Sequence, residues 1–390
     1  MKWTNRGHQL DHVKSIYGEK TKIYIYEAGI CGADLYHRIN WLGNIDGFID
    51  RNVEKQQNGY LGEQVIAPEK ILQKVDEEHI IIVAMEKKAA EQVMRLLRTA
   101  GYIKALDCFY IEDFLDFYTY QQYAFFAADK LMISSVCMIP STVCNLKCKD
   151  CLNFSPYFKK HIIHDFTFVK RDIDTLFRWI DYTPRFQVSG GEPLLNKDLG
   201  RTLVYLDENY RNRIESIETV INGSIVPGDE LCRLMKEHRI KVYLDDYREN
   251  VPQLRETYTQ TVEKLEKYGI EWIDNYVPEW FSLDVEHTEH SDMTDLQLEN
   301  YFDNCGSPWN CLENERLYSC NFAHFAAKAG IIEETENDYF DLKDYSEVRK
   351  TELLEFLLKY TTKGYVDFCK KCAGWSEANC NKVKVAEQIE

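Results

Sequence analysis

The sequence lacks the features that would place a protein in or across a membrane. It has no uninterrupted apolar run near the roughly 18 residues that a membrane-spanning helix requires. Its first residues, MKWTNRGHQLDHVK, lack the apolar core of a secretory signal peptide. We therefore expect a cytoplasmic protein with no membrane partner.

Positive charge is also scarce. The chain of 390 residues has 47 Lys and Arg against 64 Asp and Glu, a formal net charge of −17. That charge repels the phosphate backbone of nucleic acids, so we expect no nucleic-acid partner. The chain is instead rich in apolar residues: 45% of its residues are hydrophobic, which is enough for about two or three folded domains.

Thirteen cysteines are the most unusual part of the composition. Without an export signal, disulfides are disfavoured, and metal binding or catalysis explains a large number of cysteines better. Four cysteines lie singly in apolar or helical stretches and are expected to be buried packing residues: Cys31, Cys108, Cys137 and Cys232. The other nine form three groups, at 144/148/151, 305/311/320 and 369/372/380.

Residues 19–112 show strand and helix patterns in alternation. TKIYIY and HIIIVAM predict strands, and AAEQVMRLLRTAGY has helical periodicity with a glycine stop. The alternation predicts a parallel sheet in a Rossmann-like domain, with a helical lead at 1–18 and a linker helix at 113–130. In the turn EAGICG, Glu27 stands where a dinucleotide-binding turn has its first glycine, although Asp50 has the position of a ribose-binding acid. Nucleotide binding and a packing or docking role both stay open.

This domain resembles the small Rossmann-like modules of bacterial surface-polysaccharide and sugar-nucleotide enzymes. The resemblance rests on its GFID strand and on the stretch with Gly62, Val65, Ile66 and Pro68. The resemblance implies a role in such a polysaccharide or sugar-nucleotide pathway, but it does not indicate which reaction the protein catalyses.

From residue 131 the alternation of strands and helices resumes and continues to residue 283. Strands are predicted in LMISSVCMI, RFQVS, ETVI, KVYLD and IEWI, with helical patterns between them. We expect an α/β fold with a partial (β/α)6 TIM-like barrel. In such barrels, reactive groups lie on loops at the carboxyl ends of the strands.

Two motifs follow strands of this predicted barrel. Cys144, Cys148 and Cys151 come from one loop, so their thiolates can converge on one metal centre, and three thiolates leave one iron of a four-iron cubane open. One strand–helix unit later comes SGGEP, whose glycines let backbone approach a ligand and whose Glu192 offers an acceptor for an ammonium group. A structural zinc site is the alternative for the cysteines.

CNLKCKDC followed by SGGEP resembles the radical S-adenosylmethionine (SAM) superfamily. The resemblance implies a 4Fe-4S cluster on the three cysteines and SAM bound to its open iron, with cleavage to a 5′-deoxyadenosyl radical that abstracts a substrate hydrogen. Gly190, Gly191 and Glu192 would receive the amino group of SAM. The remaining candidate residues, placed at later strand ends to meet the ribose or the substrate, are Asn222, Asp245 and Asp246.

The cysteines of residues 284–390 resemble the auxiliary-cluster extensions called SPASM and twitch domains. Those extensions begin with two cysteines spanning a hairpin and close with CxxC, which here would be Cys305, Cys320, Cys369 and Cys372. The resemblance implies a second auxiliary 4Fe-4S cluster. This sequence departs from the pattern at Glu315, where glycine is expected, although Asn314 can turn the chain.

The resulting prediction is a radical SAM enzyme that epimerises or dehydrogenates a carbohydrate, as a small molecule or a nucleotide-linked sugar. Cys311 is the candidate catalytic thiol that would return a hydrogen atom, and Trp280 could stack on a sugar ring. The family implies an electron donor such as flavodoxin or ferredoxin. Two alternatives stay open: a SPASM-type maturase of a ribosomally synthesised peptide, and a zinc-stabilised binding protein without catalysis.

Overall fold

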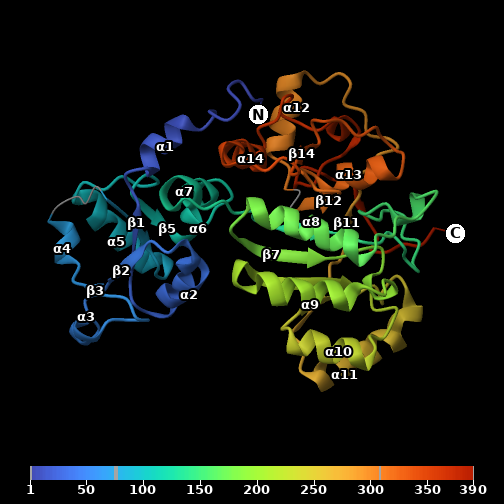
Figure 1. Ribbon diagram of the computed structural model, residues 1–390, viewed down its shortest axis with the longest axis horizontal. Helices are drawn as coiled ribbons and strands as arrows, with labels where there is room; N and C mark the ends of the chain where they lie inside the picture. Colours follow the sequence, from blue (N-terminus) through green and yellow to red (C-terminus); the bar gives the residue numbers. More distant parts are fainter. Residues whose placement is uncertain (1, 74–77, 307–308, 390) are drawn as a thin grey trace. The chain divides into compact units, whose positions relative to one another are not determined.

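The computed structural model describes residues 2–73, 78–306 and 309–389. The chain forms two compact units, one of Gly7–Met132 and one of Met1–Arg6 with Ile133–Glu390. Each unit has its own sheet (Figure 1). No helix in the described part of the chain is long and apolar enough to cross a membrane.

The unit Gly7–Met132 is built on a five-stranded parallel sheet in the order β3-β2-β1-β4-β5. The strands are β1 (Lys22–Tyr26), β2 (Ile45–Ile49), β3 (Val65–Ile66), β4 (His79–Val83) and β5 (Cys108–Tyr110). The helices are α1 (Asp11–Tyr17), α2 (Ile30–Ile39), α3 (Val53–Asn58), α4 (Glu69–Leu72), α5 (Lys87–Thr99), α6 (Ile111–Phe114) and α7 (Thr119–Ala128). Strand order reverses between β1 and β4, as in doubly wound sheets. Every residue of β4 is buried, which explains its continuous apolar run.

The second unit contains an eight-stranded sheet in the order β10-β9-β8-β7-β6-β12-β13-β14. Its parallel strands are β6 (Val136–Met138), β7 (Thr183–Val188), β8 (Ile214–Ile221), β9 (Lys241–Asp245), β10 (Trp272–Asn275) and β12 (Asn310–Glu313). The antiparallel strands β13 (Arg316–Tyr318) and β14 (Tyr339–Asp341) follow β12. An α/β fold with parallel-strand sheets is therefore confirmed, and closure into a partial barrel stays a prediction.

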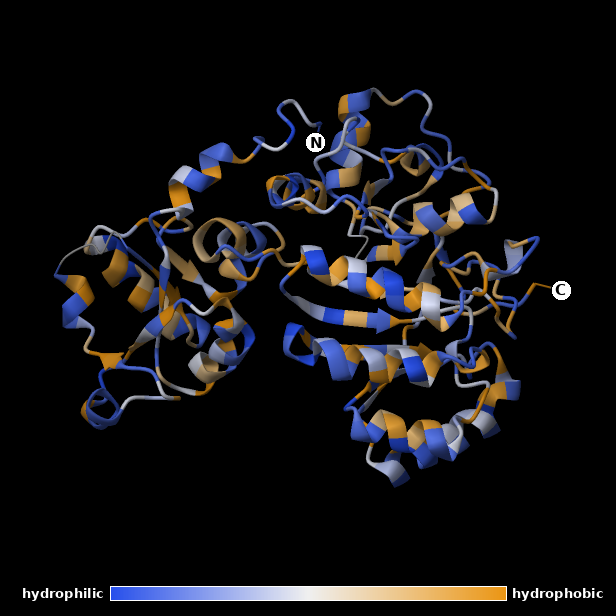
Figure 2. Ribbon diagram, in the orientation of Figure 1, coloured by the Kyte–Doolittle hydropathy of each residue, from blue (hydrophilic) through white to orange (hydrophobic). Residues whose placement is uncertain are grey.

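The helices of this unit each bury apolar side chains. They are α8 (Phe166–Trp179), α9 (Leu199–Tyr210), α10 (Asp229–Glu237), α11 (Arg255–Tyr268), α12 (Asp295–Asp303), α13 (Asn321–Lys328) and α14 (Lys350–Leu357). Helix α8 begins where the Asp165 carboxylate accepts the Phe168 amide at 2.9 Å. Its apolar side chains recur every three or four residues, and Figure 2 shows the resulting alternation of hydrophobic and hydrophilic bands.

The hairpin between β12 and β13 turns on two residues with left-handed backbone, Asn314 (φ 55°) and Glu315 (φ 56°). Two-residue hairpins of this kind favour glycine or asparagine, so Glu315 adopts a strained conformation. The fully buried Asp172 of α8 accepts both turn amides, from Asn314 at 2.6 Å and from Glu315 at 3.0 Å. This carboxylate explains how the turn tolerates a residue other than glycine, and it anchors the hairpin on α8.

Candidate active site

The SGGEP turn packs its glycines against the backbone that leads into the cysteine loop. The Gly191 amide donates to the Ser141 carbonyl at 2.9 Å, and the Glu192 amide donates to the Val143 carbonyl at 2.8 Å. A Cβ on Gly191 would come within 2.3 Å of the Val143 oxygen, and one on Gly190 within 2.8 Å of the Ser141 oxygen. Side chains at these positions are therefore excluded by the neighbouring loop, and the glycines join the two motifs.

Cys144, Cys148 and Cys151 are free thiols that lie close enough to influence one another. Burial raises the pKa of Cys144 to about 11 and that of Cys148 to about 12, and in both cases the neighbouring Cys151 thiol adds to the rise. Amide groups donate to two of the sulfurs: Asn222 Nδ2 to Cys144 at 3.7 Å, and Gln388 Nε2 to Cys148 at 3.3 Å. Convergent buried sulfurs with N–H donors suit an iron–sulfur cluster, whose cationic irons would replace the thiol protons.

Within residues 2–73, 78–306 and 309–389, no three His, Cys, Asp or Glu side chains converge closely enough to hold a single metal ion. In a cubane, each cysteine binds a different iron atom. The sulfurs therefore surround a cluster without meeting at one point.

Glu192 connects the SGGEP turn to the end of β8. Its side chain is 1% exposed, and its two carboxylate oxygens accept the amides of Leu194 at 2.9 Å and Asn222 at 2.8 Å. Burial raises the pKa of Glu192 to about 7, and the two amides oppose that rise. Glu192 therefore already has backbone partners, and its visible role is to position Asn222.

The two neighbouring acids at the end of β9 differ in their surroundings. Asp245 lines the same cavity as the three cysteines. It accepts hydrogen bonds from Tyr247 Oη at 2.7 Å and from Asn275 Nδ2 at 2.6 Å. Burial raises its pKa to about 6, against the effect of these two donors. Asp246 is instead paired with the Arg248 guanidinium at 2.7 Å. Of the two, Asp245 is placed to contact a ligand.

A cavity of about 470 Å³ opens on the three cysteines and the glycine turn. Its lining includes Cys144, Cys148, Cys151, Gly190, Gly191, Asn222, Asp245, Gln187, Asn275, Glu279, Trp280, Trp309, Asn321, Phe322 and Trp375. Cys137 of β6 also lines it, whereas Cys311 does not. Cys311 is fully buried on β12 and lies opposite Cys137 on the neighbouring strand. The structure thus places Cys137, which we expected to serve only packing, at the cavity wall.

The four cysteines predicted to hold an auxiliary cluster also lie together. Burial raises the pKa of Cys369, and the proximity of Cys320, Cys372 and Cys305 raises it further. Lys359 lies beside this group, with Nζ donating to the Cys305 carbonyl at 3.0 Å. Burial lowers the pKa of Lys359, and no carboxylate in the described part of the chain forms an ion pair with it. A half-buried ammonium without a carboxylate partner, beside four sulfurs, suits an anionic centre, so these residues fit an auxiliary cluster.

The segment 387–389 pairs with the cysteine loop, which the sequence did not predict. The Lys149 amide donates to the Glu387 carbonyl, and the Ile389 amide to the Lys147 carbonyl, both at 2.7 Å. The Gln388 side chain lies between these contacts, on Cys148. About 240 residues separate the two segments, and no local sequence pattern indicates a pairing over that distance.

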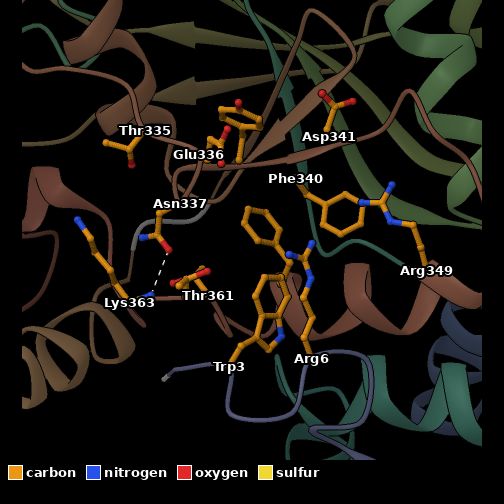
Figure 3. A pocket seen from close by; sticks show the side chains of 13 residues that line it. Trp3, Arg6, Thr335, Glu336, Asn337, Phe340, Asp341, Arg349, Thr361 and Lys363 are labelled. Atoms are coloured by element: carbon orange, nitrogen blue, oxygen red, sulfur yellow. Dashed lines mark hydrogen bonds between the residues drawn. The ribbon is translucent and has the colours of Figure 1, made fainter.

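A larger cavity, of about 600 Å³, lies elsewhere in the same unit (Figure 3). Arg6 and Arg349 line it, and their guanidinium groups lie over Trp3 at 4.4 Å and over Phe340 at 4.9 Å. Arg6 is also paired with a glutamate, at 3.2 Å from Glu352. None of its lining residues is a cysteine. Both arginines already have partners, and we assign this cavity no role in the chemistry.

In the unit Gly7–Met132, the two acids that the sequence indicated follow neighbouring strands, Glu27 after β1 and Asp50 after β2. Asp50 accepts the Ala28 amide at 3.0 Å and the Asn52 amide at 2.8 Å. Glu27 has φ 91°, and its carboxylate lies beside Gly29 at the start of α2. Carboxylates therefore surround the position at which a phosphate group would meet the helix.

Residues 138–278 match the family model of the radical SAM superfamily, so the chain carries a radical SAM domain. No curated protein sequence matches the chain. Solved structures similar to it include BtrN in complex with AdoMet and 2-DOIA, with 17% identity, 64% of this chain and 97% of that one covered, and a TM-score of 0.39. Another is anSMEcpe with bound AdoMet and Kp18Cys peptide, with 15% identity, 65% and 93% covered, and a TM-score of 0.38. A third is Streptococcus suis SuiB bound to precursor peptide SuiA, with 15% identity, 47% and 44% covered, and a TM-score of 0.29.

Proposed function

We propose, from the radical SAM domain at residues 138–278, that this chain abstracts a hydrogen atom from a carbohydrate and thereby epimerises or dehydrogenates it. The observation that carries the proposal is the shared cavity. The three-cysteine loop, the glycine turn and a set of aromatic side chains all line it. A radical made at the cysteines would therefore arise next to a surface that suits a sugar ring.

Cys144, Cys148 and Cys151 would hold the 4Fe-4S cluster, and Gly190 and Gly191 would border the amino end of SAM. When bound, the cluster and SAM supply a 5′-deoxyadenosyl radical, for which a donor such as flavodoxin or ferredoxin delivers the electron. The chain's own residues hold, orient and shield the reactants. The acceptors placed for the ribose or the substrate are Asn222 and Asp245.

An auxiliary 4Fe-4S cluster on Cys305, Cys320, Cys369 and Cys372 would favour dehydrogenation. Asn321 and Phe322 follow Cys320 directly and line the cavity. An auxiliary cluster would therefore lie one residue from the substrate wall, in a position to accept an electron from a substrate radical. Cys137 and Cys311 are the thiols to consider for epimerisation.

Iron and SAM cleavage test this proposal together. Anaerobically reconstituted protein should hold about eight irons, as two cubanes, and should form 5′-deoxyadenosine under reduction. Replacing Cys144, Cys148 and Cys151 with Ala should leave about four irons and abolish 5′-deoxyadenosine. Cys232→Ala, in α10, is the matched control and should change neither. A triple variant that keeps all its iron and cleaves SAM contradicts the assignment. A colourless zinc protein favours the non-catalytic alternative.

A peptide maturase is the second candidate. Strand β10 ends the described sheet, and Asn275 of β10 lines the cavity. An extended peptide could pair with this free edge and place a side chain in the cavity. Turnover of a peptide and not of a sugar would decide for this candidate.

A further inference from the structure

Part of the cavity lining is a group of aromatic rings from segments far from the cysteine loop in the sequence. Trp280 and Phe281 come from β11 (Trp280–Phe281), and the other rings come from residues that flank the auxiliary cysteines: Trp309, Phe322 and Trp375. Aromatic faces provide broad apolar contacts without charge. They suit the C–H faces of a ring-shaped substrate.

Two buried amide side chains line this cavity. Asn321 is 4% exposed, and its Oδ1 accepts no hydrogen bond within the described part of the chain. Gln187 of β7 is 8% exposed. An unsatisfied buried amide oxygen is costly, so its pairing with a ligand is favoured. The Asn321 oxygen requires a donor, which hydroxyl and amine groups supply and phosphate or carboxylate groups do not.

The charge of the lining excludes strongly anionic groups. None of the described lining residues is Lys, Arg or His, whereas Asp245 and Glu279 both line the cavity. A diphosphate would add negative charge to a site whose described side chains supply no cation to balance it. The net charge of −17 acts in the same direction.

We propose that the substrate is a polyhydroxylated small molecule, uncharged or carrying an amine, and without phosphate. Asn321 and Gln187 hold its polar groups, and the tryptophans pack against its ring. This inference rests on the proposed function and narrows it, because it removes nucleotide-linked sugars from the expected carbohydrates.

Substrate-stimulated 5′-deoxyadenosine formation by the reconstituted holoenzyme tests the inference. The probes are myo-inositol, glucosamine, UDP-glucose and a serine-rich hexapeptide. We expect myo-inositol or glucosamine to raise the rate about tenfold or more above the substrate-free rate, and UDP-glucose to leave it unchanged. Stimulation by UDP-glucose or by the peptide alone, or by none of the four probes, overturns the proposal.

Two variants link the response to the amides. Asn321→Ala and Gln187→Ala should each raise the KM for the stimulating probe about tenfold, which corresponds to one lost hydrogen bond. The exposed Asn209→Ala, on α9, is the matched control. Unchanged KM values in both amide variants overturn the assignment of these residues. The rate of 5′-deoxyadenosine formation without substrate distinguishes the two proposals. If no 5′-deoxyadenosine forms, the proposed function is refuted. If it forms but no polyol raises the rate, only the substrate class is refuted.

Discussion

The loop after β1 and the loop after β6 occupy equivalent positions in their sheets, but their polar groups differ in how they are paired. Beside the loop after β1, the Asp50 carboxylate at the end of β2 takes up the Ala28 and Asn52 amides, and Lys55 Nζ donates to the Ala28 carbonyl. After β6, the loop presents sulfurs to a cavity in which the buried Asn321 Oδ1 has no partner within the described part of the chain.

A strand–loop–helix pattern alone therefore does not define a binding site. The carboxyl end of a parallel sheet collects loops in both units. In the first unit the protein satisfies the loop with its own side chains, whereas in the second it leaves donors and acceptors for another molecule. The predictions below test this contrast, beginning with the open site.

Lys359 should be required for the auxiliary cluster. Its Nζ donates to the carbonyls of Phe302 at 2.9 Å and Asp303 at 3.1 Å, as well as to that of Cys305. Lys359→Met removes these three bonds and the half-buried cation, so the iron content should fall from about eight to about four per chain. Lys350→Met, which breaks a pair with Glu347 and a contact with the Tyr345 ring, is the control. Full iron content with unchanged electron paramagnetic resonance spectra would show that the cation is dispensable.

Cys137 and Cys311 should respond differently in an epimerisation assay. Cys137 lines the cavity, and burial raises its pKa to about 12, so it keeps the hydrogen that a donor must supply. With the substrate in heavy water, deuterium should enter the inverted carbon, since the thiol proton exchanges with solvent. The resulting thiyl radical then requires an electron from the external donor and a proton from solvent. Cys137→Ala should lose the inverted product and keep 5′-deoxyadenosine.

Cys311→Ala, on the adjacent strand, is the comparison. If it alone loses inversion, Cys311 is the donor, as the sequence first indicated. If both variants keep full turnover and no deuterium is incorporated, neither thiol donates, and dehydrogenation is the reaction.

Gln388 should tune the core cluster without being one of its ligands. Its Oε1 accepts the Lys147 amide at 2.8 Å, which fixes Nε2 toward the Cys148 sulfur. Hydrogen bonds to cluster sulfurs raise the reduction potential, so Gln388→Ala should shift it to a more negative value. Redox titration followed by electron paramagnetic resonance measures the shift. Glu387→Gln is the control, because Glu387 contacts the loop through its backbone. Equal potentials in all three proteins would remove Gln388 from the site.

The sequence predicted local features well and distant pairings poorly. Strand β9 lies where periodicity placed it, and α5 ends just before Gly101, at φ 104°, as the glycine stop predicted. The prediction that Asn314 turns the chain is also confirmed. These features depend on residues close together in the chain.

The missed features depend on contacts between distant segments. Strand β12 pairs with β6 in the main sheet, and Gln388 reaches the cysteine loop, although neither contact has a local sequence signal. The glycines of SGGEP were predicted to make space for a ligand. Both glycines line the cavity, so that prediction stays open, and the structure shows that they also make space for the backbone at Ser141 and Val143. A sequence motif can identify a glycine that must approach something closely, but it does not identify the neighbour.

The smallest effect is expected at the loop after β1, whose backbone groups are already paired with Asp50 and Lys55. Asp50→Ala should free the Ala28 and Asn52 amides, and their hydrogen exchange in the full chain should accelerate about tenfold or more, because bonds to a charged acceptor contribute about 1.5–3 kcal/mol. Asp34→Ala, an exposed position in α2, should leave exchange at these amides unchanged. Neither the natural chain nor Asp50→Ala should bind NAD in calorimetry, because the Glu27 carboxylate still lies at the start of α2. Tight NAD binding by the natural chain would show that Glu27 and Asp50 do not prevent a phosphate from binding at the start of α2. The loop after β1 would then be a binding site, and the contrast with the loop after β6 would be wrong.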